Sequence, residues 1–487
     1  MKKVLCFVLA LILALSVAAC AGGTPDDTVS TDTTEAASDA ATDTAAETEL
    51  RDEVPDADFG GKEFVILMQG DEEDIKTTMW AENISGDYLE DAFYNRQKYI
   101  EERFKVSFVK PLAYEFSQVS SMLGADFNSG DGAYSLVMNQ MYRSSADAIK
   151  GWCTDWNSIP YVKPSNPWYN SAILDCSIGN KLYVIVSDFS LSYIGQTWML
   201  LLNRDMADDY NIPDLYAVAN DGAWTLDKLS EYAALVYEDT NRNDKRDLGD
   251  KFGFYTSVKA GCEMAAWLYA FGGDIGVLNG VEFEITLGSE KNIDILNKIS
   301  ELAIGNAGTF NSGKQGSDFR RTVFPSGSFL FSTAQIRDVL FPEFRSMENK
   351  FSVLPLPKLN ADQTDYYTVC DGGASVLTVP YNCSDKEMVG SLVEALSWYS
   401  SKEIVPVYTG LGLESRGVRD AEGAAMMRKI IDSVRIDFAY LYDNSQGFVM
   451  LLPNMISTPS TISAVMKGNT KVKQNYYNDI ITKYISD

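Results

Sequence analysis

The stretch FVILMQGD, residues 64–71, places five apolar residues ahead of a polar end. The run is bounded by Gly60-Gly61 on one side and Gly70 on the other, so it predicts a short buried strand. Residues 87–103 follow with apolar side chains near one face and charges on the other, which predicts a helix. Residues 106–109 predict a second strand. The order strand, helix, strand predicts an α/β fold.

The rest of the body continues this alternation. Apolar runs predict strands at residues 134–138, 181–186, 198–204, 351–355 and 374–380. Amphipathic patterns predict one helix capped by Thr225 and others at residues 290–304, 387–399 and 421–433. A body of roughly 430 residues is too large for one simple core, so we expect two α/β lobes.

The N-terminus has the order of a secretory signal. Two lysines precede an apolar run (Val4–Val17), and small residues lead to Cys20. The run is too short for a comfortable membrane span. We therefore expect a signal peptide over residues 1–19. The cysteine after small residues resembles the bacterial lipobox, which implies lipidation of Cys20 and an extracellular location on the outer face of the cell membrane. An ordinary signal with a chance cysteine is the alternative.

Residues 20–55 predict a disordered acidic linker that holds the body off the membrane. Ala21 to Leu50 contains no aromatic residue and no base, and too little apolar surface to offset the entropy of ordering. Like charges keep such a segment extended. Its eight acids are Asp26, Asp27, Asp32, Glu35, Asp39, Asp43, Glu47 and Glu49.

The composition excludes several classes of function. The formal net charge of −27 argues against nucleic-acid binding, which needs basic patches. The chain has no histidine, which removes nucleophile–histidine catalysis and histidine-ligated zinc. Hydrolysis by a pair of carboxyl groups remains open.

Seven cysteines occur, of which Cys6 leaves with the signal. The five in the body do not have the spacing of a metal site, and their odd number leaves at least one unpaired. Disulfides between the first two or the last two are one interpretation, and buried free thiols are the other. These residues are Cys153, Cys176, Cys262, Cys370 and Cys383.

Several passages, taken in this order and spacing, resemble the extracellular solute-binding proteins of the maltose-binding-protein type, and more closely a long clostridial-type subgroup. The likeness runs from about Asp58 to Asp443. The passages are 58–64, 95–106, 167–170 with 181–183, 202–204, 222–229, and 354–358 with Asp437-Phe438.

The resemblance implies a two-lobed α/β fold of the type II periplasmic-binding class, with a hinge and a ligand cleft between the lobes. The first lobe would comprise residues 56–190 and 374–411, and the second residues 191–373 and 412–487. Crossings between lobes would lie near residues 189–195, Gly372-Gly373 and 410–412, where glycine tolerates unusual backbone angles.

Polar side chains that follow strand ends face the crevice of an α/β sheet. We therefore expect ligand contacts from Gln69, Asn139 and Gln140 in the first lobe. Sugars present apolar C–H faces and hydroxyl groups, so their binding takes flat aromatic surfaces and fixed polar partners.

The resemblance adds contacts from the second lobe. It implies that Trp267, with Glu263 one helical turn before it, is an aromatic platform for the ligand. It also places Gln335 and Arg337 in a stretch that contributes contacts. Local packing is the alternative for each of these side chains.

The loop DTNRNDKRDLGD, residues 239–250, has the spacing of an EF-hand-like calcium loop. Asp244 and Arg246 depart from that pattern, because glycine and an apolar residue are usual there. A solvated turn is the alternative to a structural calcium ion. The candidate ligands are Asp239, Asn241, Asn243, Asp247 and Asp250.

Together these features predict a binding protein and not an enzyme. We expect a monomeric lipoprotein that captures a small solute, a carbohydrate or oligosaccharide, and delivers it to the permease subunits of an ABC importer, with no cofactor required. A surface ligand sensor of the same fold and a carboxylate-based glycoside hydrolase are the alternatives.

Overall fold

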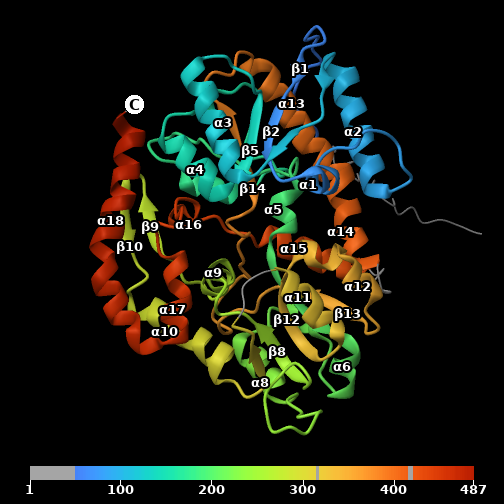
Figure 1. Ribbon diagram of the computed structural model, residues 1–487, viewed down its shortest axis with the longest axis vertical. Coiled ribbons are helices and arrows are strands. Elements are labelled where there is room, and N and C mark those ends of the chain that lie inside the picture. Colours follow the sequence, from blue (N-terminus) through green and yellow to red (C-terminus); the bar gives the residue numbers. More distant parts are fainter. Residues whose placement is uncertain (1–49, 314–316, 415–420, 487) are drawn as a thin grey trace, which may run out of the picture. The chain divides into compact units, whose positions relative to one another are not determined.

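Two five-stranded sheets organise the computed structural model, which describes residues 50–313, 317–414 and 421–486 (Figure 1). The first sheet has the order β4-β2-β5-β14-β6. Strands β2, β4 and β5 are parallel, while β14 runs antiparallel to β5 and β6. The strands are β2 (Ile66–Gln69), β4 (Leu112–Tyr114), β5 (Leu136–Gln140), β6 (Cys153–Thr154) and β14 (Ser375–Pro380).

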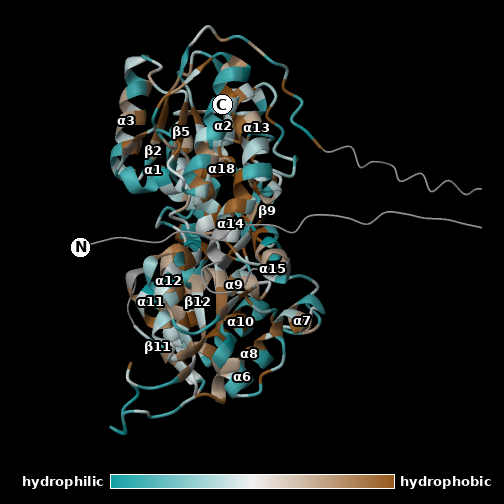
Figure 2. Ribbon diagram, turned by 90° about the vertical axis from the view of Figure 1, so that its right-hand side faces the viewer, coloured by the Kyte–Doolittle hydropathy of each residue, from teal (hydrophilic) through white to brown (hydrophobic). Residues whose placement is uncertain are grey.

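Helices cover both faces of this sheet. Helices α3 and α4 lie on one face, and α2 and α13 lie on the other (Figures 1 and 2). The Asp87 side chain caps α2 by accepting hydrogen bonds from the backbone amides of Leu89 and Glu90. The helices are α2 (Tyr88–Phe104), α3 (Phe116–Ser129), α4 (Met141–Ile149) and α13 (Lys386–Tyr399).

The second sheet has the order β11-β8-β12-β7-β13. Strands β8, β11 and β12 are parallel, and β7 runs antiparallel to both β12 and β13. Every residue of β7, β8, β12 and β13 is buried, which explains their nearly continuous apolar sequences. The strands are β7 (Trp198–Asn203), β8 (Phe252–Thr256), β11 (Thr309–Asn311), β12 (Phe329–Gln335) and β13 (Phe351–Leu354).

The remaining elements pack around these sheets. A long helix, α18 (Ile462–Ser486), lies beside the hairpin of β9 (Gly276–Asn279) and β10 (Glu282–Ile285) (Figure 1). Strands β1 (Glu63–Phe64) and β3 (Ser107–Phe108) pair separately. The other helices are α1 (Glu72–Thr78), α5 (Leu191–Gly195), α6 (Arg204–Asp209), α7 (Leu215–Asn220), α8 (Leu226–Ala234), α9 (Gly261–Ala270), α10 (Glu290–Ser300), α11 (Ser317–Val323), α12 (Pro342–Ser346), α14 (Val405–Glu414), α15 (Ala421–Asp432), α16 (Phe438–Leu441) and α17 (Leu452–Ser457).

Most of the expected elements are present, and the α/β class is confirmed. One expected strand is wrong: residues 181–186 make only isolated bridges, from Lys181 to Ile178 and from Ile185 to Leu377. Their apolar side chains are buried, so the apolar run in the sequence indicated a buried segment but not a strand of a sheet. The helix expected at residues 290–304 is also divided, because α10 ends at Ser300 and a π-helical turn follows (Glu301–Gly305).

All five cysteines of the body are free thiols. Burial raises the pKa of four of them, Cys153, Cys176, Cys262 and Cys370, well above the ordinary thiol value. The interpretation as free thiols is therefore confirmed for the described chain, with four of them buried and Cys262 half-buried. Within the same described residues, no helix is both long and apolar enough to cross a membrane.

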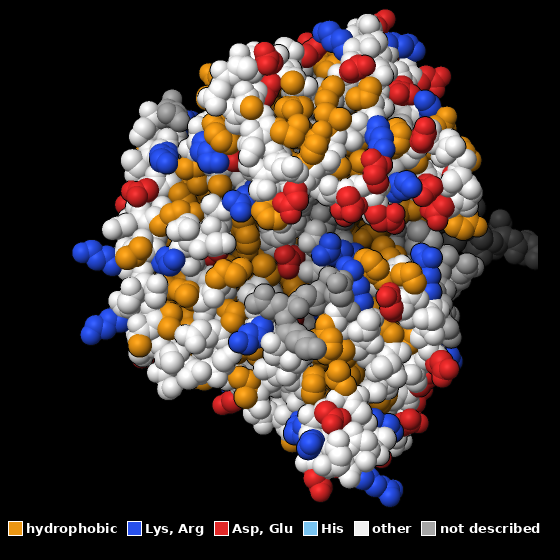
Figure 3. Space-filling view, viewed as in Figure 1, with side chains coloured by type: hydrophobic (Ala, Val, Ile, Leu, Met, Phe, Trp, Pro, Cys, Tyr) orange, Lys and Arg blue, Asp and Glu red, His pale blue; other side chains and the backbone are white. Residues whose placement is uncertain are grey.

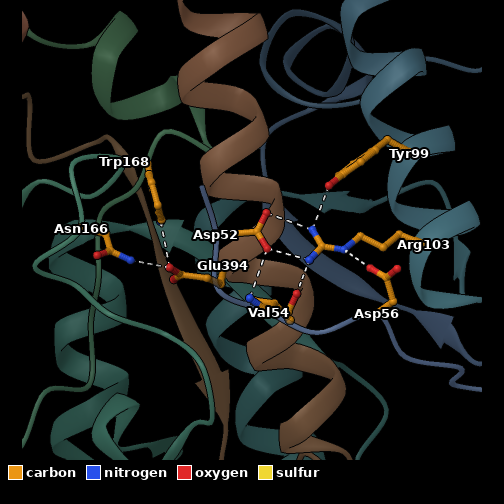
Figure 4. A network of polar contacts seen from close by, with 8 residues as sticks. All are labelled: Asp52, Val54, Asp56, Tyr99, Arg103, Asn166, Trp168 and Glu394. Carbon is orange, nitrogen blue, oxygen red and sulfur yellow. Dashed lines mark hydrogen bonds and ion pairs between the residues drawn. The ribbon is translucent and has the colours of Figure 1, made fainter. Parts of the chain in front are cut away.

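The N-terminal end of the body is held on α2 by Arg103 (Figure 4). Its Nη2 and Nη1 atoms donate to the two carboxylate oxygens of Asp52 at 2.7 and 2.9 Å, and its Nε donates to Asp56 at 2.9 Å. The Asp52 side chain is fully buried and Val54 is 5% exposed. Residues 51–55, expected in the linker, are thus packed against the body.

Replacing Arg103 with alanine should lower the free energy of unfolding by about 3 kcal/mol, because it leaves the buried Asp52 carboxylate unpaired. The matched control is Lys98→Ala on the same helix, which breaks an exposed ion pair with Glu101. That loss should stay below about 1 kcal/mol. Urea unfolding followed by circular dichroism compares the two variants. Equal losses would contradict a stabilising role for the Asp52 contact.

Three aspartates in the interior have pKa values that burial raises to about 6: Asp188, Asp437 and Asp443. The Asp188 carboxylate accepts a hydrogen bond from the Tyr193 hydroxyl at 2.6 Å, which only partly offsets its loss of water. In the unfolded chain an aspartate titrates near ~4. Between these two values the folded protein retains a proton that the unfolded chain has released.

The free energy of unfolding should therefore fall as the pH rises from about 4 to about 6, and Asp188→Asn should remove its share of this fall. The measurement is the melting temperature at several pH values across that window. Asp362→Asn, at an exposed position, is the control and should leave the slope unchanged. An unaltered slope in Asp188→Asn would contradict the raised pKa.

Candidate functional site

A cleft of about 550 Å³ lies where edges of the two sheets face each other. From the first sheet it receives the carboxyl ends of β2 and β5, the loop after β4 and the start of β14. From the second it receives the residues just before β7 and just after β12. Figure 3 shows a furrow across this face, with acidic side chains above it and basic ones below. Carboxyl ends of parallel strands are where α/β proteins bind ligands.

Gln69, at the end of β2, lines the cleft. Its side-chain Nε2 donates to the carbonyl oxygen of Gly373 at 2.7 Å and to the Ser375 hydroxyl at 2.8 Å. These contacts fix the amide and leave its carbonyl oxygen as a positioned acceptor. The prediction of Gln69 at a crevice position agrees with this placement.

Gln140 and Asn139 separate at the end of β5. Gln140 lines the cleft, and its side-chain amide has no hydrogen-bond partner among the described residues. Asn139 points the other way and is fully buried. It donates to the Phe116 carbonyl at 3.1 Å and the Ser120 hydroxyl at 3.2 Å. Alternation along a strand explains the difference, since successive side chains face opposite sides.

Arg337, directly after β12, is the basic side chain of the cleft lining. Its Nε donates to Gln335 Oε1 at 2.9 Å, and Gln335 Nε2 donates to Asp371 Oδ2 at 3.2 Å. Gln335 itself is 3% exposed and lies behind the lining. These two hydrogen bonds, which connect Arg337 to Gln335 and Gln335 to Asp371, thus hold the Arg337 guanidinium at the cleft.

In the part of the chain that the structure describes, the cleft lining carries four acids against this one base. Asp71 caps α1, and Asp74 in α1 reciprocates by accepting from the Asp71 backbone amide at 3.0 Å. Burial raises the pKa of Asp74; the hydrogen bond from the Asp71 backbone amide opposes this rise, as does the charge of Arg337, while the Asp71 carboxylate adds to it. Glu115 and Asp371 complete the acidic set. A cleft of this charge repels anions.

Trp267 and Glu263 are not brought to the cleft. Trp267 is 1% exposed, and its ring packs edge-to-face on Phe254 with centroids 5.6 Å apart. Glu263 is fully buried and accepts from the Thr256 hydroxyl at 2.6 Å. Both side chains point from α9 into the core of the second sheet. The aromatic platform expected at Trp267 therefore has no open ring face in this structure.

Two other tryptophans are likewise part of the interior. Trp168 Nε1 donates to the buried Glu394 carboxylate at 3.1 Å, as does Asn166 Nδ2 at 2.6 Å (Figure 4). Trp224, just before the start of α8, is buried, and its Nε1 donates to the Pro355 carbonyl at 3.0 Å. Among the described residues of the cleft lining, Phe116 is the one aromatic side chain.

The expected calcium ligands lie together in one loop, away from the cleft. Asp247 accepts hydrogen bonds from the amides of Asn241 and Asn243, at 2.9 and 2.8 Å. Asp239 accepts backbone amides of the same loop, and Asp250 accepts the Asp247 amide at 3.2 Å. In the described part of the chain, no three His, Cys, Asp or Glu side chains are close enough to hold a metal ion by themselves.

Several cleft residues were not predicted from the sequence: Asp71, Asp74, Glu115, Ser192, Gln196, Asp371 and Ser375. Two of them carried a usable signal. Asp71 follows β2 and Glu115 follows β4, which is the same position relative to a strand end that identified Gln69. Asp371 and Gln196 lie between elements, where no pattern in the sequence marks them.

A larger hollow of about 900 Å³ lies beside the β9–β10 hairpin and the loop that contains Gln363. Within the described chain, neither five-stranded sheet contributes a strand end to it. It therefore lacks the polar strand-end groups that characterise ligand sites in α/β proteins. The cleft at Gln69 and Arg337 is the better candidate site for this reason.

No protein-family model matches this chain, and no curated protein matches its sequence. Solved structures do match it. A cyclic α-maltosyl-1,6-maltose binding protein from Arthrobacter globiformis aligns at 13% identity with a TM-score of 0.58, over 85% of this chain and 100% of that one. The GacH receptor of Streptomyces glaucescens, solved with acarbose, aligns at 14% identity with a TM-score of 0.53, over 86% and 98%.

A third match has a different ligand. An ABC-transporter solute-binding protein from Thermotoga lettingae, bound with α-D-tagatose, aligns at 15% identity with a TM-score of 0.52, over 86% of this chain and 100% of that one. At such identities the likeness is one of fold. Residues 51–487 have the fold of the ABC-transporter solute-binding proteins of the maltose-binding type.

Proposed function

We propose that this protein captures a small neutral carbohydrate outside the cell and delivers it to an ABC importer. The observation that carries the proposal is the polar cleft at the facing edges of the two sheets, with Gln69, Gln140 and Arg337 in its lining. The fixed amide of Gln69, the amide of Gln140, which has no partner among the described residues, and the guanidinium are suitable partners for sugar hydroxyl groups. Neighbours of the same fold bind cyclic maltosides, acarbose and tagatose, which supports this ligand class.

The charge of the cleft favours neutral ligands over anionic ones. Among the described residues, four carboxyl groups lie in its lining and Arg337 is the one base that opposes them. A sugar acid would bring a further negative charge into that field and lose free energy on binding. The volume of about 550 Å³ is in the usual range for small-molecule sites.

The proposal includes a two-lobed body that closes on the ligand. Its lobes would be residues 56–190 with 374–411, and residues 191–373 with 412–487, each built on one of the five-stranded sheets. Hinge closure around a bound solute excludes water from the polar contacts and strengthens them. The closed form would be the one that the importer's permease subunits recognise, so ligand and partner are linked.

Attachment at the cell surface completes the proposal. A lipid on Cys20 and an acidic linker would keep the monomeric body close to the permease subunits, outside the membrane. The expected sites of the lipid and of most of the linker lie in residues 1–49, outside the described residues. Mass spectrometry of the mature N-terminus after expression in a lipoprotein-processing bacterium would test the acylation of Cys20.

Maltotetraose, tagatose and ribitol are suitable first probes, because neighbours of this fold bind them. We expect at least one neutral sugar or polyol to raise the melting temperature, since a ligand of the folded state stabilises it by mass action. The sugar should be recovered unchanged. Binding of no neutral carbohydrate in a wider panel would contradict the ligand class, and consumption of the sugar would contradict a pure binding role.

Gln69→Ala should weaken binding of that sugar about tenfold, as expected for the loss of a fixed hydrogen-bonding group. The matched control is Gln363→Ala in the larger hollow. Gln363 is also half-buried, and its Nε2 also donates to a backbone carbonyl, that of Ala270 at 2.9 Å. Titration calorimetry compares the two variants. Loss of affinity in Gln363→Ala alone would move the ligand site to the larger hollow.

The uronic acid that corresponds to a bound neutral sugar should bind at least tenfold more weakly at neutral pH, because of the four carboxyl groups of the cleft. Competition calorimetry against the neutral sugar measures the ratio. Added salt should reduce the difference by screening the charges. Equal affinities would show that the ligand does not meet these carboxylates.

A further inference from the structure

The loop Asp239–Asp250, which joins α8 to β8, is wound around its own polar side chains. The Asp239 carboxylate accepts the backbone amides of Asn243 at 3.2 Å and Asp244 at 3.0 Å, four and five residues on. Arg242 and Asp244 have φ angles of 54° and 55°, in the left-handed region. The backbone therefore curls so that side chains at the first, third, fifth and ninth positions face one centre.

Amide protons now occupy that centre. The side-chain amides of Asn241 and Asn243 both donate to the Asp247 carboxylate, at 2.9 and 2.8 Å. A cation at the same place would replace these protons, and each amide would turn its oxygen inward by rotation about its terminal bond. The five oxygen-bearing positions of the loop have the spacing that wraps Ca²⁺.

Asp250, at the twelfth position, supplies an independent indication. Asp250 is 1% exposed, and its Oδ1 atom is buried with no hydrogen-bond partner among the described residues. Its Oδ2 accepts the Asp247 backbone amide at 3.2 Å, so the carboxyl group faces the loop. A buried carboxylate oxygen without a donor or a cation is costly. A cation in the loop would satisfy it.

The basic residue that departs most from the calcium-loop pattern is turned away from the loop. Arg246 Nη2 donates to the Thr309 carbonyl at 2.9 Å. Its guanidinium lies over the rings of Tyr237 and Phe252, 4.3 and 5.1 Å from their centroids. In this position it packs as the usual apolar residue would, and its charge is directed towards β11 and not towards the loop centre.

We propose that this loop is a calcium site that joins the end of α8 to the start of β8. The ligands are Asp239, Asn241, Asn243, the Lys245 carbonyl and Asp250, with Asp247 acting through a water molecule. Only two carboxylates then bind the ion directly. No three His, Cys, Asp or Glu side chains of the described chain are close enough to hold a metal ion by themselves, so the amide and carbonyl oxygens of the loop would have to supply the remaining ligands. Oxygen ligands in such number favour Ca²⁺ over the smaller, octahedral Mg²⁺.

The test uses the purified protein after removal of metal ions by EGTA and dialysis. Calorimetric titration with CaCl₂ should give one site with a Kd of roughly 0.1–1 mM, the range of extracellular calcium modules. CaCl₂ at ten times this Kd should raise the melting temperature by about 2 °C or more. The same concentration of MgCl₂ should raise it less.

Two variants of the same loop separate a built site from diffuse attraction. Asp239→Asn removes a ligand charge and should weaken binding at least tenfold, whereas Asp244→Asn removes the same charge at a position without a ligand and should keep the site. Circular dichroism without calcium checks that both variants fold. The proposal is overturned if ~10 mM CaCl₂ gives neither heat nor a thermal shift, or if the two variants lose affinity equally.

Discussion

The path of the chain through residues 370–375 constrains the rest of the structure. The backbone of Cys370 forms an isolated β-bridge with Thr197, directly before β7. Five residues later, Ser375 pairs with Gln140 at the end of β5. Strand β14 then lies in the first sheet between β5 and β6, and it follows all five strands of the second sheet in the sequence. The first sheet therefore needs a strand that the chain supplies only after it has returned from the second sheet. Close packing holds this crossing in place, since a Cβ atom on Gly372 would lie 2.1 Å from Cζ of Tyr142.

The same crossing builds the cleft. The carbonyl of Gly373 accepts from Gln69 at the end of β2, and its amide donates to Asp371, so one glycine joins polar groups of the first sheet and of the crossing segment. Asp371 in turn is bound by Gln335, which positions Arg337. A change in the angle between the sheets would therefore alter the hydrogen bonds of each of these polar groups. This is the mechanical link that a protein needs if ligand binding is to alter its shape.

Sequence patterns identified the strands and helices better than the contacts of individual side chains. Residues 198–204 and 374–380 were found as strands because buried strands are continuous apolar runs. Residues 181–186 have the same kind of run, but their backbone groups pair only at isolated points, and no local signal separates the two cases. Whether an apolar run enters a sheet depends on partners distant in the sequence.

The candidate site divides in the same way. Gln69 and Gln140 were found because they lie at strand ends, a local property, whereas Arg337 was expected from the resemblance. Asn139 satisfies the strand-end rule but faces the interior, because one residue along a strand reverses the side, and Gln335, expected from the resemblance, is also buried. Trp267 was expected at the ligand by resemblance to other proteins, and here its ring fills the core between α9 and β8. A resemblance of fold does not carry over the exposure of a single side chain.

The unpaired cysteines have a consequence for where and when this protein can be made. With no disulfide among the described residues, its stability depends on packing and ion pairs alone. The chain can therefore reach the same native state in oxidising or reducing surroundings. Burial keeps the sulfur atoms in the protonated, unreactive form, so peroxide or thiol exchange would reach them only after local unfolding.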